Sequence, residues 1–332
     1  MAAFARRRIG AEAAEVLVDA AVAGISAGDS RKLSVAAAFP RMVELEREHR
    51  SLIRALLARR ERPGRLLSFD GGMETLIDAL RARLGVALRT GCRVQALERA
   101  GAGWTILPER GEPIVADRVV LAVSAARAAE MVRDLDPELA GALARFPFAG
   151  LALAAFAFGV ADVARPLDGY GYLVARREGL DTLGVTWESS LFEGRAPAGT
   201  VLLRAMLGGA RRPGVAALPE AEIAGRALRE LAPVLGITAT PLRTWVRRWP
   251  DAIAQYQLGH LERVRAARAR AARHPGLELC GTSYDGVSFQ SAIASANTAA
   301  ARVLAALEPV LAHAATGVPV LARSASEEVA TA

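Results

Sequence analysis

One stretch near the carboxyl end carries the residue types that could approach a ligand: CGTSYDGVSFQSAIASA, residues 280–296. It follows the apolar run from Leu277 to Cys280 and leads into an alanine-rich helical pattern from Ser291 to Leu307. A helix that begins after such a glycine turn points its unpaired N–H groups, and the positive end of its dipole, at whatever lies above the turn. A phosphate or another electron-rich group suits this place. An ordinary strand-to-helix turn without a ligand is the alternative interpretation.

No other catalytic pattern is present in the sequence. It contains no GxSxG, HExxH or Walker motif, and its glycine pairs at 101/103 and 169/171 lack the third glycine of a dinucleotide-binding GxGxxG. Cys92 and Cys280 belong to no CxxC pair, and the four histidines show no metal-ligand spacing. The sequence therefore predicts neither a disulfide framework nor a metal site.

The composition is that of a folded protein with a positive surface. At 332 residues, 52% hydrophobic and 23% charged, the chain is long enough for two domains or one large interleaved one. Its net charge of +7 is carried almost wholly by arginine, since Lys32 is the sole lysine. Such a surface favours anionic lipid or a substrate that bears carboxylates. The arginines are scattered and not interleaved with aromatic residues, which argues against a nucleic-acid partner.

Nothing in the sequence predicts secretion or a membrane span. The first ten residues are charged but precede no apolar stretch. The longest uncharged run, residues 146–161, is shorter than the roughly 20 residues that a spanning helix needs. The expected location is the reducing cytoplasm. The amphipathic pattern of residues 39–57 has two interpretations: packing inside a helical domain, or peripheral contact with the inner face of a membrane.

The hydrophobic spacing predicts a mixed α/β (α+β) chain. Helical spacing covers residues 11–23 and 39–57, and a polar break follows near residue 64. In residues 65–85 a short strand and a glycine turn precede a helix. The apolar face of that helix consists of Leu76, Ile77, Leu80 and Leu84. The other expected elements are strands at 93–98, 103–108 and 118–123, one or two helices at 125–145, several strands in 150–207, a helix at 217–235, a strand at 239–249 and a helix at 261–273. The tail after residue 316 is expected to be disordered.

Four stretches, in one order, resemble a known family. They are AVAGISAGDSRKLSVAAAFPRMVELEREHRSLIRALL, SFDGGMETLIDALRARL, AIAQYQLGHLERV and CGTSYDGVSFQSAIASANTAAARVL. Together they resemble the protoporphyrinogen oxidases of the flavin amine oxidase superfamily, from about residue 6 to residue 307. The first and third stretches are the most particular to that family. The resemblance implies part of an FAD/NAD(P)-binding domain, a sheet-based substrate domain and a small helical domain.

The resemblance also implies where FAD lies. The turn at 280–288 and the following helix approach the isoalloxazine ring, and the helix start faces the end of the ring that carries negative charge when reduced. The FAD contacts carried over to this turn are Thr282, Val287, Ser288 and Phe289. Val94 matches the strand residue whose main chain meets the adenine, and Trp249 matches an aromatic position near the flavin. Without a cofactor, Val94 is an ordinary strand residue and Trp249 a core residue.

Three side chains and one glycine are implied on the substrate side. Family members hold a flat tetrapyrrole between apolar side chains beside the flavin, and the matching positions are Tyr170, Leu173 and Met206. Tyr170 adds a hydroxyl where phenylalanine is more usual. Gly24 matches the glycine whose carbonyl faces the carbon that loses hydride, so it is the catalytic position. Plain core packing is the alternative interpretation for Leu173 and Met206.

The implied reaction needs no general base. It oxidises protoporphyrinogen IX to protoporphyrin IX in haem biosynthesis by hydride transfer to FAD, with O2 as the final acceptor and hydrogen peroxide as product. The protein's part is to orient the two planes and to tune the flavin.

One part of the family pattern does not occur in this sequence. In the family an N-terminal βαβ unit with GxGxxG binds the FAD pyrophosphate, and an acidic residue and a propionate-binding arginine also precede the matched region. We therefore expect the isolated chain to bind FAD poorly, to fold badly alone, or to need a partner that carries the missing Rossmann half.

The expected domains follow from these matches. They are a helical domain at 1–64, FAD-binding parts at 65–124 and 248–310, a substrate-binding domain at 125–247 and a disordered tail at 311–332. Two alternative functions stay open. One is coproporphyrinogen III oxidation, or another reaction of an amine-oxidase-like flavoprotein. The other is a non-catalytic fragment or tetrapyrrole-binding remnant.

Overall fold

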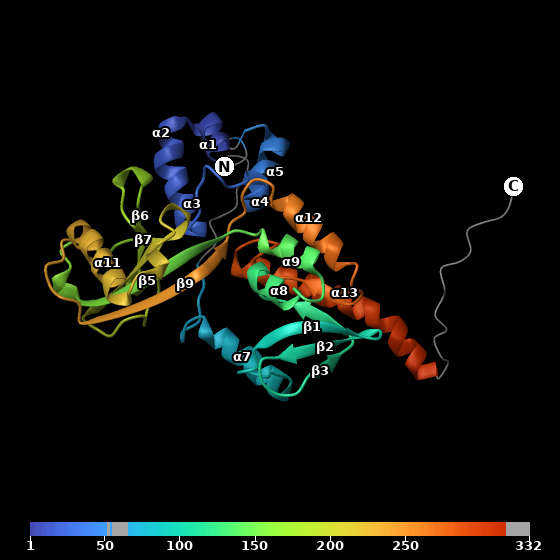
Figure 1. Cartoon of the computed structure of the whole chain (residues 1–332). Helices are drawn as coiled ribbons and strands as arrows, with labels where there is room; N and C mark the ends of the chain where they lie inside the picture. Colours follow the sequence, from blue (N-terminus) through green and yellow to red (C-terminus); the bar gives the residue numbers. More distant parts are fainter. Residues whose placement is uncertain (52–53, 55–65, 317–332) are drawn as a thin grey trace.

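A computed structural model describes residues 1–51, 54 and 66–316, and Figure 1 shows the course of the chain. The first elements are helices: α1 (Ala2–Ile9), a run formed by α2 (Ala11–Ala13), the π-helical turn η1 (Ala14–Val18) and α3 (Asp19–Ser26), then α4 (Val35–Ala38) and α5 (Pro40–His49). The helix predicted at 11–23 is confirmed. The helix predicted at 39–57 ends at His49, because Arg50 takes a left-handed conformation with φ of 56°. Leu52, Ile53 and Leu56, which belong to that prediction, lie outside the described residues.

The central element is an antiparallel five-stranded sheet. Its order is β6 (Gly171–Leu173), β7 (Thr182–Trp187), β8 (Thr200–Gly208), β5 (Phe148–Gly159) and β9 (Arg243–Ala254). Helix α11 (Glu220–Leu235) packs across one side, which we call the covered face (Figure 1). The other side is called the open face. The predicted strands within 150–207 and the helix at 217–235 are confirmed, while β9 begins and ends later than the predicted 239–249.

A second core lies beside this sheet. A β-meander of β1 (Val94–Ala100), β2 (Gly103–Pro108) and β3 (Ile114–Ala116) leads to β4 (Val119–Leu121). Strand β4 pairs in parallel with β10 (Leu277–Leu279), more than 150 residues away in the sequence. Helices α8 (Ala125–Met131), α9 (Pro137–Ala144) and α12 (His260–Ala271) share their hydrophobic core with these two strands. Thus α8 and α9, expected in the substrate domain, share the core of β4 and β10, and β9 crosses the expected boundary after residue 247.

Two helices are less well covered. The strand predicted before the glycine turn is wrong: residues 66–69 are irregular chain that leads into α7 (Glu74–Leu84). Within α7, Ile77, Leu80 and Leu84 are 45 to 52% exposed, so the other described residues cover only about half of its predicted apolar face. Helix α13 (Phe289–Thr316) begins two residues before the predicted Ser291 and continues beyond residue 311, where the tail was expected to start.

The remaining elements are short. They are η2 (Gly85–Ala87), η3 (Val160–Asp162), η4 (Arg176–Glu178), α10 (Glu188–Leu191), η5 (Gly209–Arg211) and η6 (Val215–Ala217). No helix among the described residues combines the length and apolar character that crossing a membrane would require.

Candidate active site

The open face carries a row of side chains that crosses the sheet. Register pairs Leu173 with Gly184, Gly184 with Met206 and Met206 with Leu153. Directly opposed residues of antiparallel strands point to the same face, so these four form a continuous strip. Leu153 and Met206 are partly buried and Leu173 is 49% exposed. The strip is a mainly apolar wall that other described residues leave partly uncovered.

Helix α3 brings Gly24 to the end of this wall. A Cβ atom at Gly24 would lie 2.5 Å from Cδ2 of Leu173, and one at Gly184 would lie 3.0 Å from the same atom. The side chain of Leu173 thus occupies the space between two glycines. The structure therefore brings together Gly24, Leu173 and, one strand further, Met206. Tyr170 lies just before β6 and is 68% exposed, with its carbonyl accepting the N–H of Trp187 at 3.0 Å.

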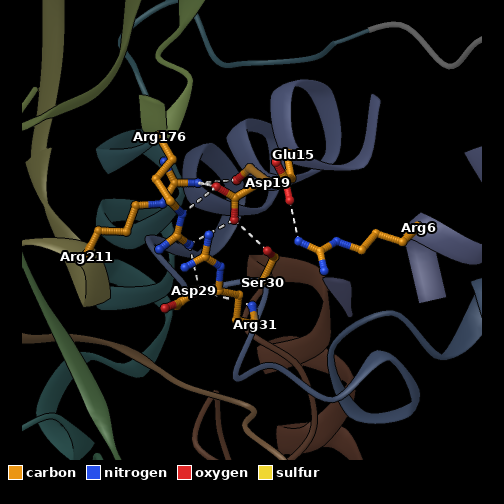
Figure 2. Close-up of polar contacts among 8 residues, drawn as sticks. All are labelled: Arg6, Glu15, Asp19, Asp29, Ser30, Arg31, Arg176 and Arg211. Carbon is orange, nitrogen blue, oxygen red and sulfur yellow. Dashed lines mark hydrogen bonds and ion pairs between the residues drawn. The ribbon is translucent and has the colours of Figure 1, made fainter. Parts of the chain in front are cut away.

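A buried polar network holds α3 beside the sheet (Figure 2). Arg176 donates from Nε and one terminal nitrogen to the two oxygens of Asp19 at 2.9 and 3.0 Å, and it also contacts Asp29 at 2.6 Å. Arg211 donates to Asp19 Oδ2 at 2.6 Å, and the Ser30 hydroxyl donates to Oδ1. Since Arg176 lies in η4, directly after β6, the network fixes α3 at the edge of the sheet that carries Leu173.

The charges of this network are balanced internally. Burial opposes ionisation of Asp19, but the hydrogen bonds from Arg176 and Ser30 and the charge of Arg211 outweigh it and lower its pKa. The hydrogen bond to Asp19 raises the pKa of Arg176. A cavity of about 440 Å³ adjoins the network, between the first helices and η4. Its lining includes the ion pair of Arg6 and Glu15, so its charges are largely paired.

The turn predicted to approach a flavin is held by side chains from two other segments. Tyr256 donates its hydroxyl proton to the carbonyl of Thr282 at 2.9 Å, and its oxygen accepts the N–H of Gly286 at 2.5 Å. Burial raises the pKa of Tyr256 to about 12, so the hydroxyl stays protonated near neutral pH. His260 stacks on its ring with centroids 3.7 Å apart. The Tyr256 hydroxyl therefore joins the two ends of the turn, at Thr282 and Gly286.

An acidic residue within the turn ties it to the neighbouring helices. Asp285 accepts two hydrogen bonds from Arg268 of α12, at 2.8 and 2.6 Å, and one from Ser295 of α13. The Ser295 hydroxyl oxygen also accepts the N–H of Gly281 at 2.9 Å. The turn consequently has a fixed main-chain path before any ligand is considered.

The start of α13 leaves its outer surface free. The Ser288 hydroxyl accepts the N–H of Ser291 at 3.0 Å and so caps the helix. Ser288 was predicted from the sequence as a cofactor contact, whereas this capping role was not predicted. Val287 is half-buried, whereas Thr282, Ser288 and Phe289 are exposed. The first turn of the helix contains no acidic residue. A rigid turn, an uncharged helix start and exposed main chain are a suitable seat for the electron-rich end of an isoalloxazine ring.

The other two predicted cofactor residues belong to strands outside this turn. Trp249 is on β9, 43% exposed, and pairs with Leu151 next to the wall. Val94 begins β1, and its carbonyl already accepts a hydrogen bond from Arg127 at 2.8 Å. An adenine contact through Val94 would have to use the rest of its main chain or compete with Arg127. Among the described residues, no three histidine, cysteine or acidic side chains gather as a metal site would require.

Sequence reasoning missed three features of this region. Asp19 gave a usable signal, because a single acidic residue stands in the apolar run VLVDAAVAG. Tyr256 gave a weaker one, since it belongs to the recognised QYQLGH stretch. The pairing of Arg176 with Asp19 spans 157 positions and left no local signal.

Comparison with known proteins places this geometry in a family. The model of the flavin containing amine oxidoreductases matches residues 1–304. The chain is 29% identical to coproporphyrinogen III oxidase of Bacillus subtilis over 302 residues, covering 87% of this chain and 64% of that protein. It is 30% identical to the chloroplastic protoporphyrinogen oxidase of Oryza sativa (90% and 62% covered) and 32% identical to that of Nicotiana tabacum (90% and 60%). The chain thus spans 60 to 64% of the length of these relatives.

Solved structures agree with the sequence comparison. A protein from Exiguobacterium sp. 255-15, to which protoporphyrinogen oxidase activity has been attributed, superposes with a TM-score of 0.75 at 27% identity, covering 88% of this chain and 64% of that one. Cyclohexylamine oxidase from Brevibacterium oxydans shares the fold, with a TM-score of 0.64 at 17% identity, covering 92% of this chain and 67% of that one. The predicted resemblance, the mixed α/β fold class and the predicted flavin, for which the family is named, are confirmed. The chain therefore belongs to the flavin-containing amine oxidoreductase family.

Proposed function

We propose that this chain supplies the substrate wall and the flavin-side turn of an enzyme that oxidises protoporphyrinogen IX to protoporphyrin IX, with FAD as cofactor and O2 as final acceptor. The observation that carries the proposal is the contact of Gly24 with Leu173 at the end of an apolar row that includes Met206. These three positions come from segments far apart in the sequence, and the family resemblance assigned each of them to the substrate side. FAD, when bound, supplies the acceptor for the hydride that leaves the macrocycle.

The residues of the chain perform the positioning. Leu153, Met206 and Leu173 offer a flat apolar surface on which a tetrapyrrole is held by area burial rather than by specific hydrogen bonds. Gly24 has no side chain, so Leu173 packs directly on the main chain of α3 and joins that helix to the end of the wall. Tyr256 and Asp285 hold the flavin-side turn at a fixed position, which reduces the reorganisation needed when the two planes are brought together.

Coproporphyrinogen III is an alternative substrate that also has specific support. The Bacillus subtilis relative is named for that reaction and covers 87% of this chain at 29% identity. An apolar wall accepts the macrocycle of either porphyrinogen, so both substrates belong in the same assay.

We further propose that a Rossmann half, on the same longer protein or on a partner chain, supplies the pyrophosphate site. Two features support this. Strands β4 and β10 form a parallel sheet of only two strands within the described residues, and parallel sheets are usually larger and covered on both faces. The half-exposed apolar side chains of α7 and α13, such as Leu84 and Ile293, also need a covering partner.

The test is flavin retention followed by turnover. The chain, alone and co-expressed with a Rossmann half from a relative, is incubated with FAD and desalted, and flavin absorbance at about 450 nm is measured. Fluorescence of the porphyrin product is then followed with each porphyrinogen. We expect retained flavin and oxidation of at least one substrate in the co-expressed sample. A sample that is folded, retains flavin and oxidises neither porphyrinogen contradicts the proposal, and a folded sample that binds porphyrin but no flavin indicates a tetrapyrrole-binding remnant.

A glycine pair tests the wall itself. Gly24→Val places a branched side chain where Leu173 and the macrocycle edge meet, so oxidation is expected to fall by at least about tenfold, the effect of a small misplacement of reacting groups. The matched control is Gly141→Val in α9, where a Cβ atom would meet nothing within 4 Å. Equal oxidation rates for the two variants would show that Gly24 has no role in the active site.

A further inference from the structure

The apolar row of the open face ends on a positive charge. Leu153 pairs with Met206 on one side and with Arg247 of β9 on the other. Arg247 therefore shares the face of the substrate wall, although it belongs to an edge strand and is exposed. Neither the sequence motifs nor the site described above assigned it a role.

The charge of Arg247 has no carboxylate partner among the described residues. Its one hydrogen bond there goes to the adjacent carbonyl of Val246 at 3.0 Å. Two other arginines of the same face are engaged: Arg204 pairs with Glu188 at 2.8 Å, and the Arg243 guanidinium lies 5.6 Å from the ring centre of Trp245. Arg247 is thus the guanidinium next to the wall whose charge remains available to a ligand.

Two tryptophans flank this guanidinium. Trp245 and Trp249 lie two residues before and after Arg247, so all three side chains leave the strand on the open face. The tryptophans are 40% and 43% exposed. The face around Arg247 therefore carries exposed aromatic surface on both sides of the charge, on which a flat apolar ligand can rest while its acidic group meets the guanidinium.

The spacing matches a carboxyalkyl substituent on a macrocycle. Neighbouring strands lie about 4.8 Å apart, so the main chain of Arg247 is roughly 10 Å from that of Met206, two strands away. A tetrapyrrole resting on Met206 and Leu153 would therefore reach the guanidinium with a short carboxylate arm. We propose that Arg247 is a carboxylate-binding subsite for an acidic substituent of the tetrapyrrole, held by a bidentate pair. This inference rests on the proposed function and adds a specificity-determining residue to it.

The experiment measures binding without turnover. Protoporphyrin IX and its dimethyl ester share one macrocycle and differ in the charge of two substituents, so they serve as stable probes in the same detergent solution. Dissociation constants for both, obtained from tryptophan quenching and confirmed by the porphyrin absorbance shift, are compared for the chain, Arg247→Gln, Arg247→Lys and the control Arg243→Gln. Arg243 lies on the same strand and face, four residues further from Trp249.

The expected result is a loss of selectivity for the acid. The unaltered chain should bind the acid about tenfold more tightly than the ester, the effect of one charge-assisted pair. Arg247→Gln should remove that difference and leave ester binding unchanged, Arg247→Lys should restore part of it, and Arg243→Gln should keep it whole. Unfolding midpoints establish that each variant is folded.

The contrary outcomes separate the two proposals. If the unaltered chain binds the acid and the ester equally, or if Arg247→Gln keeps the preference for the acid, the subsite is wrong while the tetrapyrrole wall stands. If the folded chain binds neither probe, alone or with a Rossmann half and FAD present, the proposed function fails and the subsite fails with it.

Discussion

The two faces of the five-stranded sheet differ in what covers them. On the covered face Phe156, Leu203 and Leu207 are at most 1% exposed because α11 packs across them. On the open face, from the same strands, Leu153 and Met206 remain partly exposed, although they adjoin a small core in which Ala23 and Ala27 pack with Leu151 and Leu183. An antiparallel sheet that faces water on one side normally alternates apolar and polar residues. Strand β5 is apolar on both faces, which indicates that the open face is built to be covered by something other than solvent.

The largest effect concerns the network that fixes the edge of the open face. Asp19→Ala leaves Arg176 and the buried Arg211 without their shared carboxylate, so the free energy of unfolding should fall by about 4 kcal/mol. Because the pKa of Asp19 is lowered in the folded protein, its contribution is present above the unfolded pKa of about 4 and is lost as pH falls through the folded value. Urea unfolding at several pH values measures both effects.

The matched control for that variant is Glu12→Ala, an exposed carboxylate that lines the adjoining cavity. It should change the unfolding free energy by less than about 0.5 kcal/mol. Equal losses for the two variants would mean that α3 is held by apolar packing and that the polar network contributes little.

The comparison of the faces is tested directly by two neighbours on β8. Leu203→Ala on the covered face removes a side chain with 0% exposure and should cost about 3 kcal/mol in unfolding free energy. Met206→Ala on the open face should cost roughly 1 kcal/mol or less, because the site is already partly open. Adding a porphyrin should raise the cost of Met206→Ala and so narrow the difference between the two variants, since the tetrapyrrole stabilises the unaltered chain more than Met206→Ala. Similar costs without ligand would show that the open face is an ordinary core.

The smallest effect compares the buried Tyr256 with the partly buried Tyr172. Tyr256→Phe leaves the N–H of Gly286 and the carbonyl of Thr282 without their partner and should cost about 1 kcal/mol. Faster amide hydrogen exchange at Gly286 would accompany it. Tyr172→Phe is the control, because burial raises its pKa to about 12 as well, yet it packs against the covered-face core without the turn's hydrogen bonds. Unchanged exchange at Gly286 in Tyr256→Phe would show that the Tyr256 hydroxyl does not hold the turn in place.

The sequence predicted the elements better than their partners. The alternating pattern of 150–207 and the helical spacing of 217–235 report local periodicity, and both appear in the structure. Recognised motifs also predicted Gly24, Leu173 and Met206, which the fold brings together at one wall. Local patterns could not reveal the pairing of β4 with β10, the pairing of Asp19 with Arg176, or Arg247 opposite Leu153, because each depends on strand register or on contacts between distant segments.

The place of Leu173 between Gly24 and Gly184 has a consequence for how this sequence can vary. Any side chain at Gly24 would collide with the tip of Leu173 at 2.5 Å, and relief requires that tip to move or to be shortened. Exchange at position 24 alone should therefore be disfavoured, while exchange together with a smaller residue at 173 should be tolerated. Among descendants of this chain the two positions should therefore tend to change together, because a smaller residue at 173 leaves room for a larger one at 24.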